Sequence, residues 1–160
     1  TAGTGPACAR IRKMFSPIKA AAYVFAQCGA ALLAGLIATF VYGGRANIGY
    51  PYPATGVSDG RAFLAELVAT YMLTYVVLHV ATAAKNAGNN FFGLAIGFTV
   101  ASMAVTVGGI SGGAFNPAVG LLGVVGGFGS DFSKIWIFWV ACPLAGVLAG
   151  LSHLPRAGLW

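Results

Sequence analysis

Charged residues are scarce in this 160-residue chain: they make up 8% of it, and only three are acidic. A soluble domain carries about 25% charged residues, so a soluble globular protein is excluded. The chain is instead 58% hydrophobic, with a mean hydropathy of +0.83. We therefore expect an all-α integral membrane protein that lies in a lipid bilayer. Basic residues in such proteins mark membrane topology, so the net charge of +6 does not indicate a nucleic-acid partner.

The chain also lacks the residue groupings that indicate an enzyme or a metal site. Its three cysteines lie far apart and have neither metal-binding nor disulfide spacing. There are no paired carboxylates, and no serine, histidine and acidic motifs lie near one another. The run GGISGG at 108–113 does not match the GxGxxG of a nucleotide-binding turn. The sequence thus predicts no catalysis, no cofactor and no metal. His79 and His153, each near the end of an apolar run, are interpreted as interfacial residues, with a gating or pH-sensing role as the alternative.

Four apolar runs are each close to the ~20 residues that a helix needs to cross a bilayer. They predict transmembrane helices at 18–41, 62–84, 91–107 and 135–151. A basic segment, 1–17, precedes them, and a short tail, 153–160, follows them. Six of the nine basic residues fall on the side of the two termini, so the positive-inside rule places both termini in the cytoplasm. These six are Arg10, Arg12, Lys13, Lys19, Lys85 and Arg156.

Between the third and fourth runs lies a glycine-rich stretch, GGISGGAFNPAVGLLGVVGG, at 108–127. Asn116 is a favoured helix N-cap and Pro117 a favoured first helical residue, and the glycines at 126–127 end the helix. The predicted half-helix, 117–126, is about 15 Å long, which is half of the ~30 Å bilayer core. Irregular backbone at that depth is tolerated where it lines a cavity or is buried in protein. We therefore expect a re-entrant half-helix whose positive N-terminus faces a cavity.

Three polar side chains in these segments could carry a function. Glu66 is the only acidic residue in a predicted span, and a carboxylate there needs a partner. We expect it to accept hydrogen bonds from backbone N–H groups of the re-entrant loop; the alternative is a place at the water interface, one turn past Arg61. Gln27 is expected to bond across helices or to a loop carbonyl. The side-chain oxygen of Asn116 can cap the half-helix while its amide donates to a passing water or polyol, or Asn116 is a plain cap.

The stretch SGGAFNPAVG, at 111–120, resembles the Asn-Pro-Ala (NPA) loop of the aquaporin, or major intrinsic protein, family. The resemblance covers about residues 16–152. It implies an inverted-repeat channel of six helices and two half-helices, a homotetramer when full-length, through which water or small neutral solutes pass in single file. The family's third to sixth helices are matched, in order and spacing, by the runs at 19–35, 63–77, 94–105 and 136–150.

The resemblance also implies roles for particular residues. Asn116, Pro117 and Ala118 would form the second of the family's two NPA motifs, and Glu66 and Gln27 would brace its loop. Water or solute would then bond to backbone carbonyls and to the asparagine amide on its way through the pore.

The selectivity ring that the resemblance implies departs from the usual residues. Val119 stands where the family usually has arginine, Ala104 where water-selective members often have histidine, and Gly113 completes the ring. We expect a wide, uncharged constriction that passes larger neutral solutes and has lost one barrier to cations. The solute itself stays open, because Gly120 and the pair Phe138-Trp139 do not match a glycerol channel.

The family's first two helices and first NPA loop find no match in this sequence, and Gly5-Pro6-Ala7 is interpreted as a remnant of that loop. One pore needs both halves, so we interpret the chain as a fragment of a longer channel, or as a non-conducting truncated homologue. A secondary transporter with a broken helix is a further alternative, which would need a coupling-ion site. The spans offer only Glu66 for that role. A non-transporting membrane protein also stays open.

Overall fold

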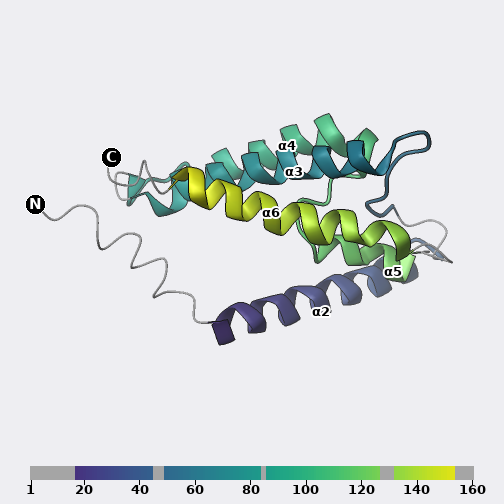
Figure 1. Ribbon diagram of the computed structural model, residues 1–160. Coiled ribbons are helices and arrows are strands. Elements are labelled where there is room, and N and C mark those ends of the chain that lie inside the picture. The colour runs from purple at the N-terminus through teal and green to yellow at the C-terminus, as the bar shows by residue number, and fades with distance from the viewer. Residues whose placement is uncertain (1–16, 45–48, 84–85, 127–131, 154–160) are drawn as a thin grey trace, which may run out of the picture.

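Four long apolar helices dominate the computed structural model, which describes residues 17–44, 49–83, 86–126 and 132–153. With the short helices that extend them, the apolar spans are 20 to 24 residues long, which is enough to cross a bilayer. The described residues contain no β-strand, so the expected all-α fold with four membrane-spanning helices is confirmed. The long helices (Figure 1) are α2 (Pro17–Val41), α3 (Asp59–Val77), α4 (Phe92–Ser111) and α6 (Ile135–His153).

Shorter helical elements extend or connect these helices. A π-helix, η2 (Leu78–Thr82), continues α3, and a 3₁₀ turn, η5 (Phe132–Lys134), leads into α6. A second 3₁₀ turn, η4 (Val119–Leu121), runs directly into α5 (Leu122–Gly126). The half-helix predicted at 117–126 thus begins two residues later than expected, because residues 117 and 118 form a turn that the side chain of Asn116 closes.

The end of α4 corrects the boundary expected from the sequence. We placed the end of the third span, 91–107, before the glycines at 108 and 109, but the helix continues through them to Ser111. Glycine is common in transmembrane helices, and Ser111 is fixed by hydrogen bonds of its hydroxyl. The helix ends at Gly112, which has a left-handed φ of +91° and donates its N–H to the carbonyl of Gly108.

The other expected bounds differ by a few residues or lie outside the described part of the chain. The span expected at 62–84 begins earlier, at Asp59, whose carboxylate pairs with Lys134. Of the predicted segments 1–17 and 153–160, only Pro17 and His153 lie within the described residues.

Small residues let the helices approach one another closely. α3 lies between α6 and α4, and packs more extensively on α6. On α6 the alanines at 141, 145 and 149 are spaced four residues apart and are fully buried, as are Ala62 and Ala69 on α3. Such small side chains are typical of helix contacts in a bilayer, where close van der Waals packing replaces the hydrophobic effect.

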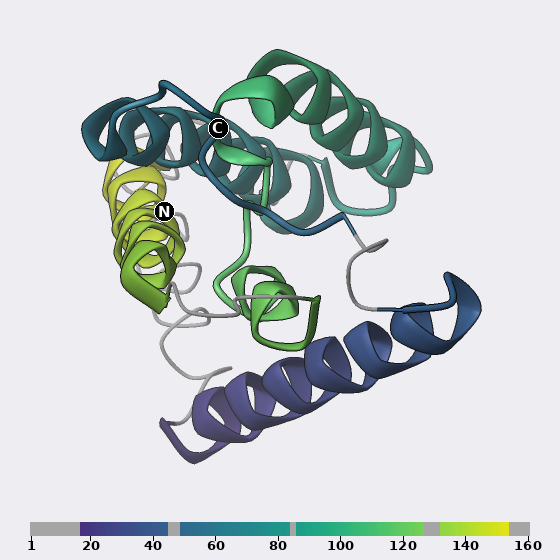
Figure 2. The ribbon, with the colours of Figure 1, turned by 90° about the vertical axis from the view of Figure 1, so that its right-hand side faces the viewer.

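The segment between α4 and α5 crosses the interior of the molecule, as Figure 2 shows. α2 lies on the far side of that segment from α4, and packs on α5 and η4. The re-entrant segment therefore lies between helices, with Ala114 and Ala118 buried and residues 115–117 half-buried. Irregular backbone at membrane depth is tolerated where it is buried in protein or lines a cavity.

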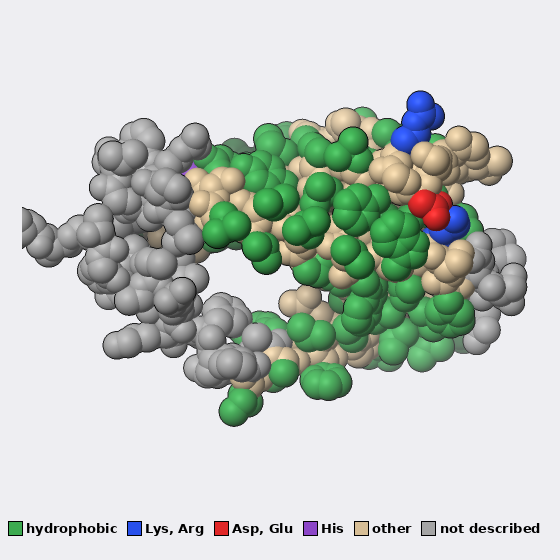
Figure 3. Space-filling model, viewed as in Figure 1, with side chains coloured by type: hydrophobic (Ala, Val, Ile, Leu, Met, Phe, Trp, Pro, Cys, Tyr) green, Lys and Arg blue, Asp and Glu red, His purple; other side chains and the backbone are tan. Residues whose placement is uncertain are grey.

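The outer surface is apolar over most of the face in Figure 3, and the charged side chains visible there gather at one end. At that end the ammonium of Lys134 lies 2.6 and 2.8 Å from the two carboxylate oxygens of Asp59. Large apolar side chains, such as Phe25 and Phe40 of α2, are more than three-quarters exposed. An apolar outer surface on helices of this length is expected for contact with lipid.

Candidate functional site

The carboxylate of Glu66 organises the re-entrant loop. It projects from α3 and has no exposed surface, so the alternative of a water-interface position does not describe it. Its Oε1 accepts from the hydroxyl of Ser111 at 2.7 Å and from the N–H of Ala114 at 2.9 Å. Its Oε2 accepts from the N–H of Phe115 at 2.9 Å. These charge-assisted bonds satisfy backbone donors that helix geometry leaves without partners.

Three left-handed backbone conformations, two of them at adjacent glycines, allow the loop to reach that carboxylate. Gly112 and Gly113 have φ values of +91° and +66°, and Phe115 has +53°, the only positive φ of a non-glycine residue among those described. A left-handed conformation costs an L-residue about 1–2 kcal/mol. The bond from the N–H of Phe115 to Glu66 is what offsets that cost, because it holds the backbone in place.

The loop also lies directly against the connection that precedes α3. A Cβ atom added at Gly112 would lie 2.5 Å from the Cα of Pro51 and 2.6 Å from the backbone nitrogen of Tyr52. Nearby, the N–H of Ala54 donates to the carbonyl of Ile110 at 3.0 Å. Only glycine fits at position 112, for reasons of both space and conformation.

Asn116 closes the turn that opens the half-helix. Its Oδ1 accepts from the N–H of Ala118 at 2.9 Å, and its carbonyl accepts from the N–H groups of Val119 and Gly120 at 3.1 and 3.3 Å. Its Nδ2 donates to Oε1 of Gln27, on α2, at 3.2 Å. A side-chain amide has two N–H donors, so this contact leaves one of them for another acceptor. The structure thus brings Asn116 and Gln27 together across two elements.

The three positions expected to form the selectivity ring lie on different parts of the fold. Val119 is half-buried and begins η4, while Gly113 lies three residues before Asn116. Ala104 lies on α4 and is exposed. A Cβ added at Gly113 would lie 3.1 Å from Cζ of Phe115, so the ring of Phe115 occupies the space beside that position. The role of these residues in selectivity stays a prediction.

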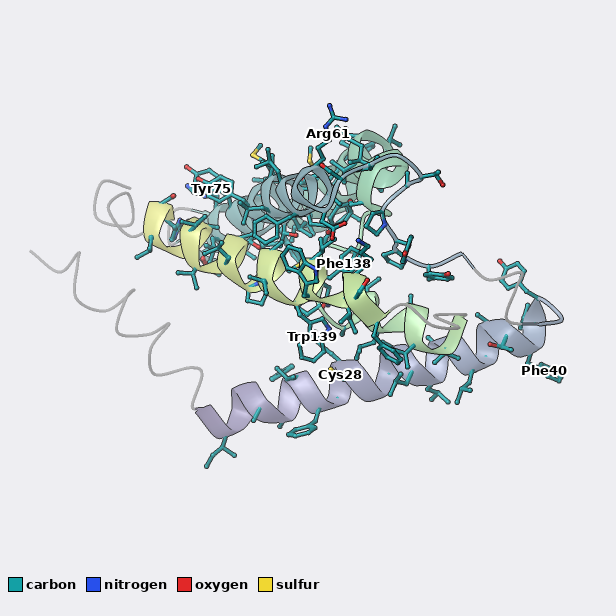
Figure 4. The ribbon with its side chains drawn as sticks, turned by 45° about the vertical axis from the view of Figure 1, so that its right-hand side comes forward. Cys28, Phe40, Arg61, Tyr75, Phe138 and Trp139 are labelled. Atoms are coloured by element: carbon teal, nitrogen blue, oxygen red, sulfur yellow. The ribbon has the colours of Figure 1, made fainter. Side chains whose placement is uncertain are left out.

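Close contacts with two long helices fix the half-helix. A Cβ added at Gly120 would lie 2.9 Å from the Cβ of Phe138, which is fully buried on α6. On the other side, a Cβ at Gly35 of α2 would lie 2.9 Å from the Cβ of Val125. Figure 4 shows Phe138 in the middle of the molecule, with Cys28 on the side of α2 that faces α6. The half-helix is thus held between α2 and α6 by glycines at the crossing points.

Sequence reasoning missed the roles that Ser111, Phe115 and Phe138 have in this site. The position of Ser111 beside the glycines was the one sequence feature that could have indicated its role. Its partner Glu66 lies 45 positions away in the chain, so the contact itself could not be inferred. Nothing in the sequence pattern marks Phe115 as a left-handed residue, since such a conformation is rare for aromatic side chains. Gly120 stood out as a departure from a family pattern, and the structure gives it a packing role against Phe138.

Comparison with known proteins gives consistent matches. The family described as major intrinsic protein matches residues 7–153. Probable aquaporin TIP2-2 of Arabidopsis thaliana is 36% identical over 137 residues, which are 82% of this chain and 52% of that protein. Aquaporin-B of Dictyostelium discoideum is 31% identical over 175 residues, with 89% of this chain and 58% of that protein covered. The chain spans about half the length of the curated relatives it matches.

Proposed function

This chain belongs to the major intrinsic protein family, and from that premise we propose that it forms one half of a passive membrane channel for water or small neutral solutes. The observation that carries the proposal is the Asn116 turn. Its side chain caps the half-helix through Oδ1 and presents Nδ2 as a donor on the side of α2. A donor at a positive helix end binds the oxygen of water or of a polyol and disfavours a cation.

The depth of the turn supports this function. Glu66 lies about 10 Å along α3 from Asp59, at 1.5 Å per residue, and the loop bonds to it directly. With the Asp59–Lys134 pair at the water interface, the loop would lie well inside the ~30 Å apolar core of a bilayer. A polar turn at that depth is stable because its donors are satisfied, and its remaining amide donor can serve a solute in transit.

We further propose that Ala104, Gly113 and Val119 line a wide, uncharged constriction. None of the three carries a charge or a hydrogen-bonding side chain, so a solute larger than water would meet little electrostatic or steric resistance there. The side chain of Phe115 beside Gly113 adds an apolar wall. This constriction would favour small neutral solutes over strict water selectivity.

A complementary half completes the pore in this proposal. The curated relatives are about twice as long as the region that this chain matches. We propose that a second set of helices, with its own half-helix, packs against this chain, and that the completed channel assembles as a homotetramer. A non-conducting homologue is the alternative in which no such half is recruited.

An ion-coupled transporter is less well supported than a channel. Both carboxylate oxygens of Glu66 accept hydrogen bonds from the loop. The carboxylate therefore holds the loop and has no free oxygen with which to bind a coupling ion. No second buried acidic side chain lies on α3.

The test is stopped-flow light scattering on proteoliposomes, with water, glycerol and urea as permeants. We expect low permeability from this chain alone, and water and solute permeability after co-expression with the N-terminal half of a related aquaporin. A completed, correctly assembled sample that permeates nothing would overturn the channel proposal. Full permeability from the chain alone would overturn the complementary half, and uptake that requires a proton or sodium gradient would favour the transporter.

A further inference from the structure

The chain has only two histidines in 160 residues, and the fold brings them into contact. His79 lies on η2, at the end of α3, and His153 is the last residue of α6. Their ring centroids are 4.7 Å apart, with the rings at 84°. This pair lies at the end of α3 opposite Asp59, far from the Asn116 turn, and the channel proposal makes no use of it.

His79 is held in a tautomer that leaves a nitrogen lone pair available. Its Nδ1 lies 2.8 Å from the carbonyl oxygen of Tyr75. A carbonyl only accepts, so Nδ1 carries the hydrogen and Nε2 carries the lone pair. Histidines that bind metals usually have this arrangement, because the second N–H is fixed by a carbonyl or carboxylate. The ring also packs on that of Tyr75, with centroids 4.1 Å apart.

His153 has a nitrogen that lacks a partner inside the protein. The residue is 5% exposed. Its Nδ1 is the one buried side-chain nitrogen or oxygen without a hydrogen bond among the residues that the structure describes. An unsatisfied buried polar group costs about 1–3 kcal/mol. A ligand that takes the lone pair of this imidazole would remove that cost.

The backbone that carries His79 is unusual and firmly held. π-Helices such as η2 are rare and occur often at functional sites. The carbonyls of His79 and Val80 accept from the side-chain amides of Asn86 and Asn89, at 2.8 and 2.7 Å. The π-turn is thus held at His79 and at the residue that follows it, which positions the imidazole next to α6.

We propose that His79 and His153 bind a divalent transition-metal ion, such as Zn²⁺ or Cu²⁺, that bridges η2 and the end of α6. Imidazole nitrogens are preferred ligands of these ions. The described residues contain no group of three or more histidine, cysteine or acidic side chains, so water completes the coordination. The edge-to-face rings need the His153 imidazole to rotate about its Cβ–Cγ bond, a torsion with broad energy wells, while His79 keeps its bond to the carbonyl of Tyr75.

The sequence alone does not indicate this site. The two histidines are far apart in the chain, and neither has a second ligand at the close spacing by which metal sites are usually found. Only the contact between η2 and α6 brings them together.

Isothermal titration calorimetry of the untagged 160-residue chain in detergent with ZnCl₂ tests the proposal. We expect one Zn²⁺ per chain, with affinity at least about tenfold weaker in His79→Gln and in His153→Gln, as for the loss of a metal's supporting groups. Cys28→Ser, which removes a half-buried thiol, is the matched control and should bind as the unsubstituted chain does. Circular dichroism of each variant checks that it is folded.

Pulsed electron paramagnetic resonance with Cu²⁺ counts the imidazoles directly. We expect two coordinated imidazoles in the unsubstituted chain and one in either histidine variant. The proposal is overturned if the unsubstituted chain binds no Zn²⁺, if His79→Gln binds it equally well, or if Cys28→Ser abolishes binding. These readouts do not depend on permeability, so they separate this proposal from the channel.

Discussion

The hydroxyl of Ser111 lies 2.7 Å from Oε1 of Glu66, which ties the last residue of α4 to the middle of α3. The same carboxylate takes the N–H groups of Ala114 and Phe115. Three donors from one short segment thus converge on a single buried anion. Because the two backbone N–H groups would lose their acceptor in an apolar interior without it, the position of the loop depends on that carboxylate.

Replacing Glu66 by glutamine should destabilise the protein. The amide group would place an N–H₂ where a carboxylate oxygen now accepts, so at least one of the three donors would lose its acceptor. We expect a loss of about 1–3 kcal/mol or more in the free energy of unfolding. Thermal or denaturant unfolding in detergent micelles measures it.

Asp59→Asn is the matched control for that substitution. Asp59 also has a bonded carboxylate, but its side chain is 38% exposed and that of its partner Lys134 is 26% exposed. Exposed ion pairs contribute about 0–1 kcal/mol, so this change should be small. Equal losses in the two variants would contradict the structural role of Glu66.

Gly112→Ala should be among the most damaging single substitutions in the chain. The new methyl group would overlap backbone atoms of Pro51 and Tyr52. Backbone atoms cannot rotate away from the methyl group as the end of a flexible side chain could. The left-handed conformation adds about 1–2 kcal/mol. We expect a strong loss of folded, monodisperse protein in size-exclusion chromatography.

Gly120→Ala tests the crossing of η4 and α6 in the same way. Its methyl group would lie 2.9 Å from the Cβ of the buried Phe138, so η4 and α6 would have to separate. Overpacking of this kind costs about 1–3 kcal/mol. Gly97→Ala, where a Cβ would meet nothing within 4 Å, should stay within about 0.5 kcal/mol of the unsubstituted chain. A Gly97 effect as large as that of Gly120 would show that close packing is not the cause.

Asn116→Asp should separate permeation from stability. Aspartate keeps the oxygen that accepts from Ala118, but it loses the donor to Gln27 and adds a negative charge. In the completed channel we expect lower permeability to neutral solutes and a cation conductance, with thermal stability nearly unchanged. Asn116→Ala, which also removes the cap, should cost about 1 kcal/mol. Unchanged permeability in both variants would exclude Asn116 from the conduction path.

Val119→Arg should narrow the proposed constriction and give it a positive charge. In proteoliposomes with the completed channel, we expect glycerol and urea permeability to fall severalfold more than water permeability. Val119→Leu adds volume without charge and is the control. If both solutes and water respond equally to the arginine, Val119 does not contribute to selectivity.

The sequence predicted the helices well because their length and apolarity are local properties. It also indicated the turn at Asn116, since capping chemistry depends on adjacent residues. The boundary at Val107 was wrong because the glycines that follow it were interpreted as loop, while the contacts of Ser111 with Glu66 keep them helical. The fit of Gly120 on Phe138 could not be predicted, because it depends on how distant segments pack.

The contact between Gly112 and the Pro51–Tyr52 backbone also has a bearing on biogenesis. A ribosome delivers α2, that connection and α3 to the membrane before it has made the re-entrant segment. The Pro51–Tyr52 backbone and the Glu66 carboxylate, which both contact the re-entrant segment, are therefore already synthesised when Gly112 leaves the ribosome. Of the elements that contact the half-helix, only α6, which carries Phe138, is synthesised after it. We expect the elements to assemble in the order in which they are synthesised, so that the re-entrant segment packs against α2 and α3 when these helices are already in the membrane.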